Sequence, residues 1–90
     1  MFDQKTEGAF QDIFGGIQDD IKRVADWWEK KCGEEGPYCM WYEYQGERQY
    51  KYRSTVKECI LAAMGAHEFF TMNSITEVES HGQFFRRHYK

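Results

Sequence analysis

Apolar residues recur at intervals of four and three along the first third of the chain, and this spacing constrains the fold more than any other feature. The series comprises Phe10, Phe14, Ile17, Ile21, Val24 and Trp28. Such spacing places every member on one stripe of an amphipathic helix. Lys30 and Lys31 suit the negative end of a helix, and Gly33 suits a left-handed cap. We therefore predict one long helix from Gly8 to Cys32, which either breaks at Gly15-Gly16 or packs closely there against another backbone.

Two aromatic segments follow this helix and flank a short turn that contains glycine. Residues 38–44 and 48–53 surround Gln45-Gly46-Glu47, a pattern that predicts a β-hairpin. In the second strand Tyr50 and Tyr52 alternate with polar residues. This alternation indicates one solvated face and one buried face, with the two tyrosines on the buried face.

The first strand of the hairpin differs, because it carries apolar residues on both faces. Tyr42 and Tyr44 share one face, whereas Trp41 adds apolar bulk to the other. Trp41 is therefore either covered by another segment or presented to a partner. An isolated two-stranded hairpin is marginal in water, so we expect it to pack on the first helix or to pair with a second copy. Both strands are expected to be edges, which favours pairing with another chain.

Two further helices are predicted after the hairpin. Thr55-Val56-Lys57-Glu58 matches the capping box of a helix start, and this helix should extend to about Phe70. Ser74-Ile75-Thr76-Glu77 repeats the box, and the apolar residues after it favour a third helix that reaches the C-terminal tail. Residues 74–80 also alternate, so the alternative is a strand that turns at His81-Gly82 into a second hairpin.

The length and composition fit one small domain. The chain has 90 residues, of which 41% are hydrophobic and 18% aromatic. We predict a single α+β domain over residues 1–90, with a long amphipathic helix, a β-hairpin and then two helices. No apolar run approaches the roughly 20 residues that span a bilayer, and Met1-Phe2-Asp3-Gln4-Lys5 lacks the basic segment and apolar stretch expected of a signal peptide. A cytoplasmic protein without membrane contact is the expectation.

The core must be built without the usual leucines, because Leu61 is the only one in the chain. Phenylalanine, tyrosine, tryptophan, isoleucine and methionine take their place. This bias resembles the composition of small phage and mobile-element proteins. The resemblance concerns composition only, and it implies the cytoplasm of a host cell as the place of action.

No combination of residues matches a catalytic or metal-binding template. Cys32, Cys39 and Cys59 are odd in number, which fits a reducing compartment, and they lack the close spacing of a zinc site. Cys59 and His67 would lie about 12 Å apart along one helix, too far for direct proton transfer. We therefore expect no enzymatic activity, no metal and no cofactor.

The aromatic surplus is typical of a protein interface. We predict a non-catalytic protein-binding module, most concretely a phage-type inhibitor that occludes a host or defence enzyme. A homodimer is also favoured, because Gly15-Gly16 inside the helical pattern would suit a close backbone neighbour. The predicted contacts are aromatic anchors and acidic residues of the first helix, which would steer the partner or imitate a nucleic-acid backbone: Trp27, Trp41, Tyr42, Tyr44, Asp19, Asp20 and Asp26.

Nucleic-acid binding is the alternative function. Basic residues gather on the hairpin and mix with aromatic residues in the tail, namely Arg48, Lys51, Arg53, Arg86, Arg87 and Lys90. The net charge of −3 lacks the positive balance expected of a dedicated nucleic-acid-binding protein. Binding to another protein is therefore preferred.

Overall fold

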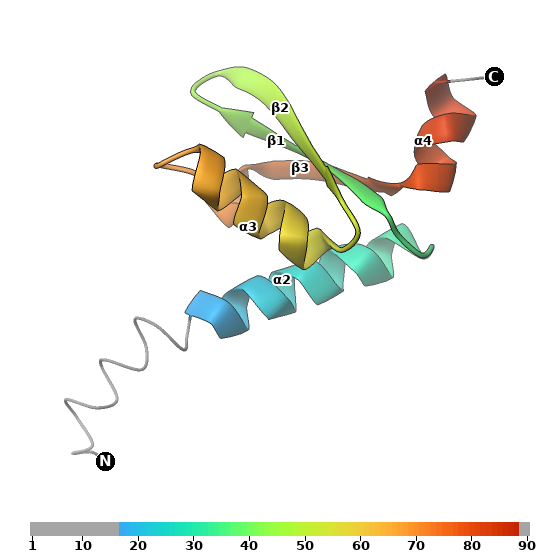
Figure 1. Cartoon of the computed structure of the whole chain (residues 1–90), viewed down its shortest axis with the longest axis horizontal. Coiled ribbons are helices and arrows are strands. Elements are labelled where there is room, and N and C mark those ends of the chain that lie inside the picture. The colour runs from blue at the N-terminus through green and yellow to red at the C-terminus, as the bar shows by residue number, and fades with distance from the viewer. Residues whose placement is uncertain (1–16, 89–90) are drawn as a thin grey trace, which may run out of the picture.

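A three-stranded antiparallel sheet with α2 and α3 packed on one face and α4 at one end forms the structure of residues 17–88, which the computed structural model describes (Figure 1). The elements are α2 (Ile17–Cys32), β1 (Tyr38–Tyr44), β2 (Glu47–Arg53), α3 (Val56–Ala66), the 3-10 turn η2 (Met72–Ser74), β3 (Ile75–Ser80) and α4 (His81–His88). The predicted α+β class is confirmed, and so is the order of helix, hairpin and helix.

The apolar stripe of α2 faces the core as predicted. Ile21 and Ala25 are buried, and Trp28 packs against the same cluster. Gly33 ends the helix with a φ of 78°, and its N–H donates to the carbonyl of Glu29 over 3.0 Å. The part of the predicted helix that precedes Ile17, including Gly15-Gly16, lies outside the described residues.

The predicted hairpin is present, with a two-residue turn. Gln45 and Gly46 have φ values of 52° and 83°, which is the type I′ geometry that suits the twist of the strands. However, the prediction that both hairpin strands are edges is wrong for β1, because β3 pairs with its other side and the sheet order is β2-β1-β3. Only β2 remains an edge of the hairpin.

The capping box at the start of α3 is confirmed. The Thr55 hydroxyl accepts from the Glu58 N–H over 3.1 Å, and the Glu58 carboxylate accepts from the Thr55 N–H over 3.3 Å. The helix ends at Ala66 rather than near Phe70. His67 adopts extended backbone there, because its ring leaves the helix to form a hydrogen bond with a buried tyrosine of β1.

The helix predicted from Ser74 is wrong in its first half, because Ile75–Ser80 forms a strand that pairs with β1. The alternative is right for this strand but wrong for the hairpin, since His81–His88 is helical. A second capping box explains where α4 begins. The Ser80 hydroxyl accepts from the Gln83 N–H over 3.0 Å, and the Gln83 side-chain oxygen accepts from the Ser80 N–H over 3.1 Å.

The core lies between the helices and one face of the sheet. α2 packs against α3 and β3, and α3 packs against β1 and β2. The buried members are Ile21, Ala25, Tyr38, Met40, Tyr42, Val56, Cys59, Ile60, Ala63, Ile75 and Val78. Neither α2 nor α3 covers the opposite face of the sheet. Within residues 17–88, no helix is long and apolar enough to cross a membrane.

Candidate functional site

The face of the sheet that α2 and α3 leave uncovered is the candidate site, and we call it the open face. Side chains alternate along a strand, and residues directly opposite each other share a face. Trp41 lies opposite Tyr50 on one side and opposite Glu77 on the other. The open face thus comprises Cys39, Trp41 and Glu43 of β1, Arg48, Tyr50 and Tyr52 of β2, and Glu77 and Glu79 of β3.

Aromatic rings form the centre of the open face. Tyr50 is 55% exposed, Tyr52 is 37% exposed, and the ring of Tyr50 lies 5.1 Å from that of Trp41. The Trp41 indole is half-buried and fixed, because its Nε1 donates to Glu79 over 2.8 Å and the Arg48 guanidinium lies 4.3 Å from its ring centre. The Trp41 ring is therefore partly buried by its neighbours and partly exposed to solvent.

The charged groups of the open face neutralise one another. Arg48 pairs with Glu77 over 3.1 Å, and Arg87 of α4 pairs with Glu77 and, over 2.8 Å, with Glu79. These carboxylates raise the pKa of Arg87 above its ordinary value, mainly through the hydrogen bond that Arg87 donates to Glu77. Glu79 is 2% exposed, and its two oxygens bind Trp41 and Arg87, so this buried carboxylate is fully satisfied.

Tyr52 and α4 close one end of the open face. The Tyr52 hydroxyl and Nδ1 of His81 form a hydrogen bond, and the His81 ring lies 4.5 Å from the ring of Phe85. Phe85 is 45% exposed. The aromatic surface of β2 thus continues onto α4.

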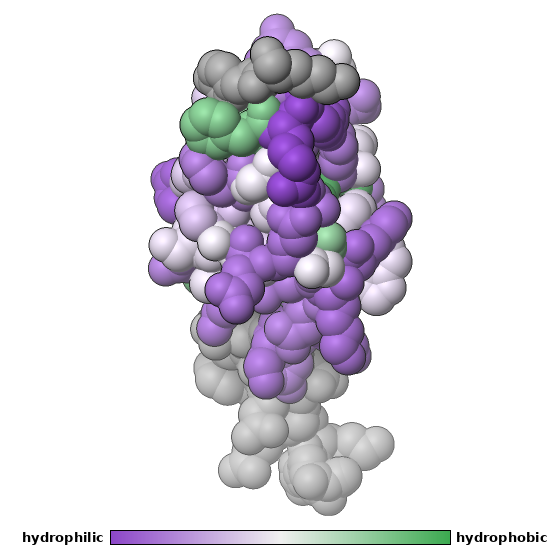
Figure 2. Space-filling model, turned by 90° about the vertical axis from the view of Figure 1, so that its right-hand side faces the viewer, coloured by the Kyte–Doolittle hydropathy of each residue, from purple (hydrophilic) through white to green (hydrophobic). Residues whose placement is uncertain are grey.

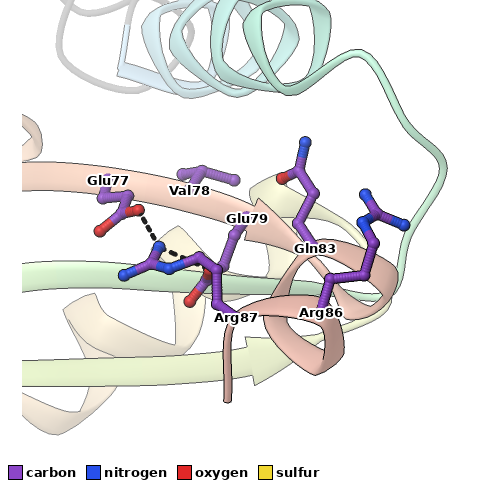
Figure 3. A pocket seen from close by; sticks show the side chains of 6 residues that line it. All are labelled: Glu77, Val78, Glu79, Gln83, Arg86 and Arg87. Carbon is purple, nitrogen blue, oxygen red and sulfur yellow. Dashed lines mark hydrogen bonds and ion pairs between the residues drawn. The ribbon is translucent and has the colours of Figure 1, made fainter. Parts of the chain in front are cut away.

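A shallow hollow of about 460 Å³ lies between β3 and α4, lined by Glu77, Val78, Glu79, Gln83, Arg86 and Arg87 (Figure 3). Its polar side chains already bind one another or nearby groups of the chain. Arg87 binds the two glutamates, and Gln83 binds the carbonyl of Cys32 over 3.1 Å. We interpret the hollow as a joint that holds α4 in place.

Glu34 completes this joint from the loop after α2. Its carboxylate accepts from the Ser80 hydroxyl and from Arg86, each over 2.7 Å. These two hydrogen bonds hold the pKa of Glu34 below its ordinary value.

The end of the molecule that carries α4 has a mainly hydrophilic surface with a small hydrophobic area (Figure 2).

The cysteines are free thiols, and two of them are buried. Burial raises the pKa of Cys39 to about 12 and that of Cys59 to about 11, so both stay protonated and unreactive near neutral pH. Cys32 is partly exposed and donates to Gln83 over 3.2 Å. Across residues 17–88, no group of three or more histidines, cysteines and acidic residues could hold a metal ion.

The predicted partner contacts do not lie on one surface. Trp41 is on the open face, whereas Trp27 is on α2, 55% exposed, with the Lys31 ammonium 5.0 Å from its ring centre. The prediction for Tyr42 is wrong, because this residue is fully buried on the core side, where its hydroxyl binds His67 over 2.8 Å. Tyr44 is partly buried on the same side.

The first helix is not an acidic surface over its described length. Asp19, Asp20 and Asp26 are exposed as predicted, but Arg23 forms an ion pair with Asp20. Four acidic and four basic residues alternate between Ile17 and Cys32. Imitation of a nucleic-acid backbone by this segment therefore loses its basis.

The basic residues of the alternative function are not gathered either. Arg48, Arg86 and Arg87 each bind a carboxylate, whereas Lys51 and Arg53 lie on the core side of β2 by register. Lys90 lies outside the described residues. The fold thus leaves little free positive charge on one surface of residues 17–88.

Tyr50 and Tyr52 are the site residues that sequence reasoning missed. Their alternation with polar residues was correctly identified as a two-faced strand, but the prediction that they face the core is wrong. The alternation of tyrosines with polar residues in β2 indicates two different faces, but it does not indicate which face the helices cover. Register with Trp41 would have found them, because residues opposite each other in a hairpin share a face.

We compared the chain with protein-family models, with curated proteins and with solved structures, and none of the three comparisons finds a match. No family or related fold therefore informs the function.

Proposed function

We propose that this protein is a non-catalytic binding module that contacts another protein through the open face. The observation that carries the proposal is Tyr50, which is 55% exposed beside the half-buried ring of Trp41 on the face that α2 and α3 leave uncovered. Tyrosine, tryptophan and arginine are the residues enriched at the energetic centres of protein interfaces. This face presents all three as neighbours.

The fixed position of the rings supports such a role. Trp41 is held by Glu79 and lies under Arg48, so its ring is ordered before any partner arrives. An ordered side chain loses little conformational entropy on binding. The open face would therefore act as a rigid aromatic contact with charged groups around it.

The most concrete version of this function is a phage-type inhibitor that occludes a host or defence enzyme. The aromatic-rich composition with Leu61 as the only leucine supports it, as does a face that offers aromatic and charged contacts. Inhibition would be steric, with the open face covering part of the enzyme. The proposed place of action is the host cytoplasm.

Binding to single-stranded nucleic acid is the alternative, because bases can stack on exposed aromatic rings. The charges of the open face favour a protein instead. Glu43, Glu77 and Glu79 lie on this face, and its arginines already have carboxylate partners. Phosphate groups would meet negative charge beside the rings that the bases need.

The test compares Tyr50→Ala with Trp27→Ala in quantitative affinity capture from lysates of candidate hosts. The two residues are a matched pair, since each is 55% exposed and they lie on different elements, Trp27 on α2 and Tyr50 on β2. We expect the wild type and Trp27→Ala to capture the same protein in saturable fashion, and Tyr50→Ala to lose it.

Titration of labelled single-stranded DNA and RNA at two salt concentrations provides the second arm. We expect no saturable binding at concentrations on the order of micromolar. Tight binding with a steep salt dependence would favour the alternative. Equal capture by both alanine variants would remove the open face as the contact surface.

A further inference from the structure

The outer edge of β2 pairs with no strand in the part of the chain that the structure describes. The sheet order is β2-β1-β3, so β2 pairs with β1 only, whereas β3 has α2 beside it (Figures 1 and 3). A free edge presents backbone donors and acceptors to another strand. We propose that β2 pairs with β2 of a second copy and forms a symmetric dimer with one antiparallel sheet through both chains.

The turn determines which backbone groups this edge presents. A type I′ turn closes with a hydrogen bond between its first and fourth residues, here Tyr44 and Glu47. Along an antiparallel pair, hydrogen-bonded and non-hydrogen-bonded residue pairs alternate. The N–H and C=O groups of Arg48, Tyr50 and Tyr52 therefore point away from β1.

An observed contact agrees with this assignment. The Arg53 guanidinium donates to the backbone carbonyl of Tyr52 over 2.8 Å, so this carbonyl has an acceptor position outside the ladder with β1. In the dimer, the same carbonyl would accept from a backbone N–H of the second copy. The Arg53 side chain would then be released to bind elsewhere.

The side chains of β2 are complementary to themselves in one register. With the two-fold axis at Tyr50, the two Tyr50 residues face each other and Glu47 of each copy lies opposite Arg53 of the other. Arg48 of each copy lies opposite Tyr52 of the other. This register overlaps the whole strand and allows about six backbone hydrogen bonds.

Other registers of the β2–β2 pair give less favourable side-chain contacts. An axis at Lys51 would place two lysines opposite each other, which is unfavourable. An axis at Gln49 would leave Tyr52 and Arg53 without facing strand residues. Charged residues on an edge normally discourage pairing. In the symmetric register, however, the Arg53 guanidinium of each copy lies opposite the Glu47 carboxylate of the other, so the charges attract.

α3 packs against both β1 and β2 on the core side of the sheet. In the dimer, the two α3 helices would therefore lie on the same side of the joined sheet.

This proposal does not depend on the proposed partner binding. Glu47 and Arg53 lie on the core side of β2, so changes at these positions leave the open face intact. The dimer would place two open faces next to each other on the same side of one sheet. The two proposals can therefore fail separately.

A charge exchange tests the register. Sedimentation equilibrium should show a concentration-dependent dimer for the wild type. Glu47→Arg alone and Arg53→Glu alone each place like charges opposite each other twice, and each should weaken the dimer about tenfold. The double variant, Glu47→Arg with Arg53→Glu, restores opposite charges and should return to within about threefold of the wild type. Circular dichroism spectra would check that every variant is folded.

Disulfide cross-linking gives a second measurement. Tyr50→Cys, in a Cys32→Ser background, should form a covalent dimer under mild oxidation, because hydrogen-bonded antiparallel residues lie about 5.5 Å apart and that distance suits a disulfide. Glu43→Cys is the control on the same face but away from the edge, and it should not cross-link. A wild type that stays monomeric at millimolar concentration, or a dimer that neither single charge variant weakens, would overturn the proposal.

Discussion

Gly36 lies where the loop after α2 passes close to the chain that leads into α3. A Cβ atom at this position would overlap the Ser54 carbonyl oxygen and would lie 2.7 Å from the ring of Tyr38. The carbonyl belongs to the backbone and the ring is part of the core, so neither can move without cost. Only glycine fits here.

We predict that Gly36→Ala lowers the free energy of unfolding by about 1–3 kcal/mol, the usual cost of overpacking. Gly65→Ala is the matched control. A Cβ at Gly65 meets nothing within 4 Å, and alanine favours a helix over glycine by about 1 kcal/mol. Denaturant unfolding measures both variants. Equal effects of the two substitutions would contradict the packing described for Gly36.

The thiols give a second prediction at the residue scale. Cys39 and Cys59 are buried with raised pKa values, whereas Cys32 is partly exposed. A thiol reagent such as Ellman's reagent should therefore modify one cysteine rapidly in the folded protein and all three after denaturation. Mass spectrometry would identify the first site as Cys32. Rapid modification of Cys39 would show that the neighbouring side chains of the open face do not bury its thiol.

The start of α3 shows how a local signal defines an element. The hydrogen bonds between Thr55 and Glu58 satisfy backbone N–H groups that the first turn of a helix leaves without partners. Val56 donates its N–H to Glu29 of α2 over 3.0 Å. The helix start is thus fixed both by its own cap and by the neighbouring helix.

We predict that Thr55→Ala lowers the free energy of unfolding by about 1 kcal/mol, because it removes the side-chain acceptor of the cap. Thr55→Ser keeps the hydroxyl and should stay close to the wild type. Thermal or denaturant unfolding of the three proteins checks this. A loss of equal size in both variants would point to the methyl group rather than to the cap.

At the scale of the whole molecule, Glu34 connects three parts of the fold. It follows α2, binds Ser80 at the end of β3 and pairs with Arg86 of α4. Because α4 has no buried residue of its own, such polar contacts carry much of its attachment. The attachment of α4 therefore depends in part on the charge of Glu34.

This dependence predicts an effect of pH. The pKa of Glu34 in the folded protein lies below its ordinary value of 4.5, through hydrogen bonds from Ser80 and Arg86. The resulting stabilisation is present above that ordinary value and is lost as the pH falls through the lowered pKa. We expect the free energy of unfolding to fall below pH 4.5, and to fall less steeply in Glu34→Gln.

The neighbouring exposed Glu35 provides the control. Glu35→Gln should keep the acid sensitivity of the wild type, as measured by denaturant unfolding at a series of pH values. Hydrogen exchange of the α4 amides would locate the effect and should increase at acidic pH. Unchanged acid sensitivity in Glu34→Gln would assign the effect to another carboxylate.

Much of the fold follows from local patterns. The apolar stripe of α2, the turn at Gln45-Gly46 and the capping box at Thr55 each need only a few adjacent residues, and each was predictable. The capping box formed by Ser80 and Gln83 was equally local and was overlooked, because the apolar spacing from Ser74 favoured a helix. The apolar spacing indicated a helix that begins at Ser74, whereas the capping box indicated a helix that begins after Ser80.

The amino-acid sequence by itself determined the helices, the hairpin and their order, since periodicity and capping act over a few residues. Only the tertiary structure decided that β3 joins β1 and that Tyr42 is buried while Tyr50 is exposed. A strand pattern marks two faces, but the helix packing selects which face becomes the core. The open face and the free edge of β2 exist because α2 and α3 both pack on the other side.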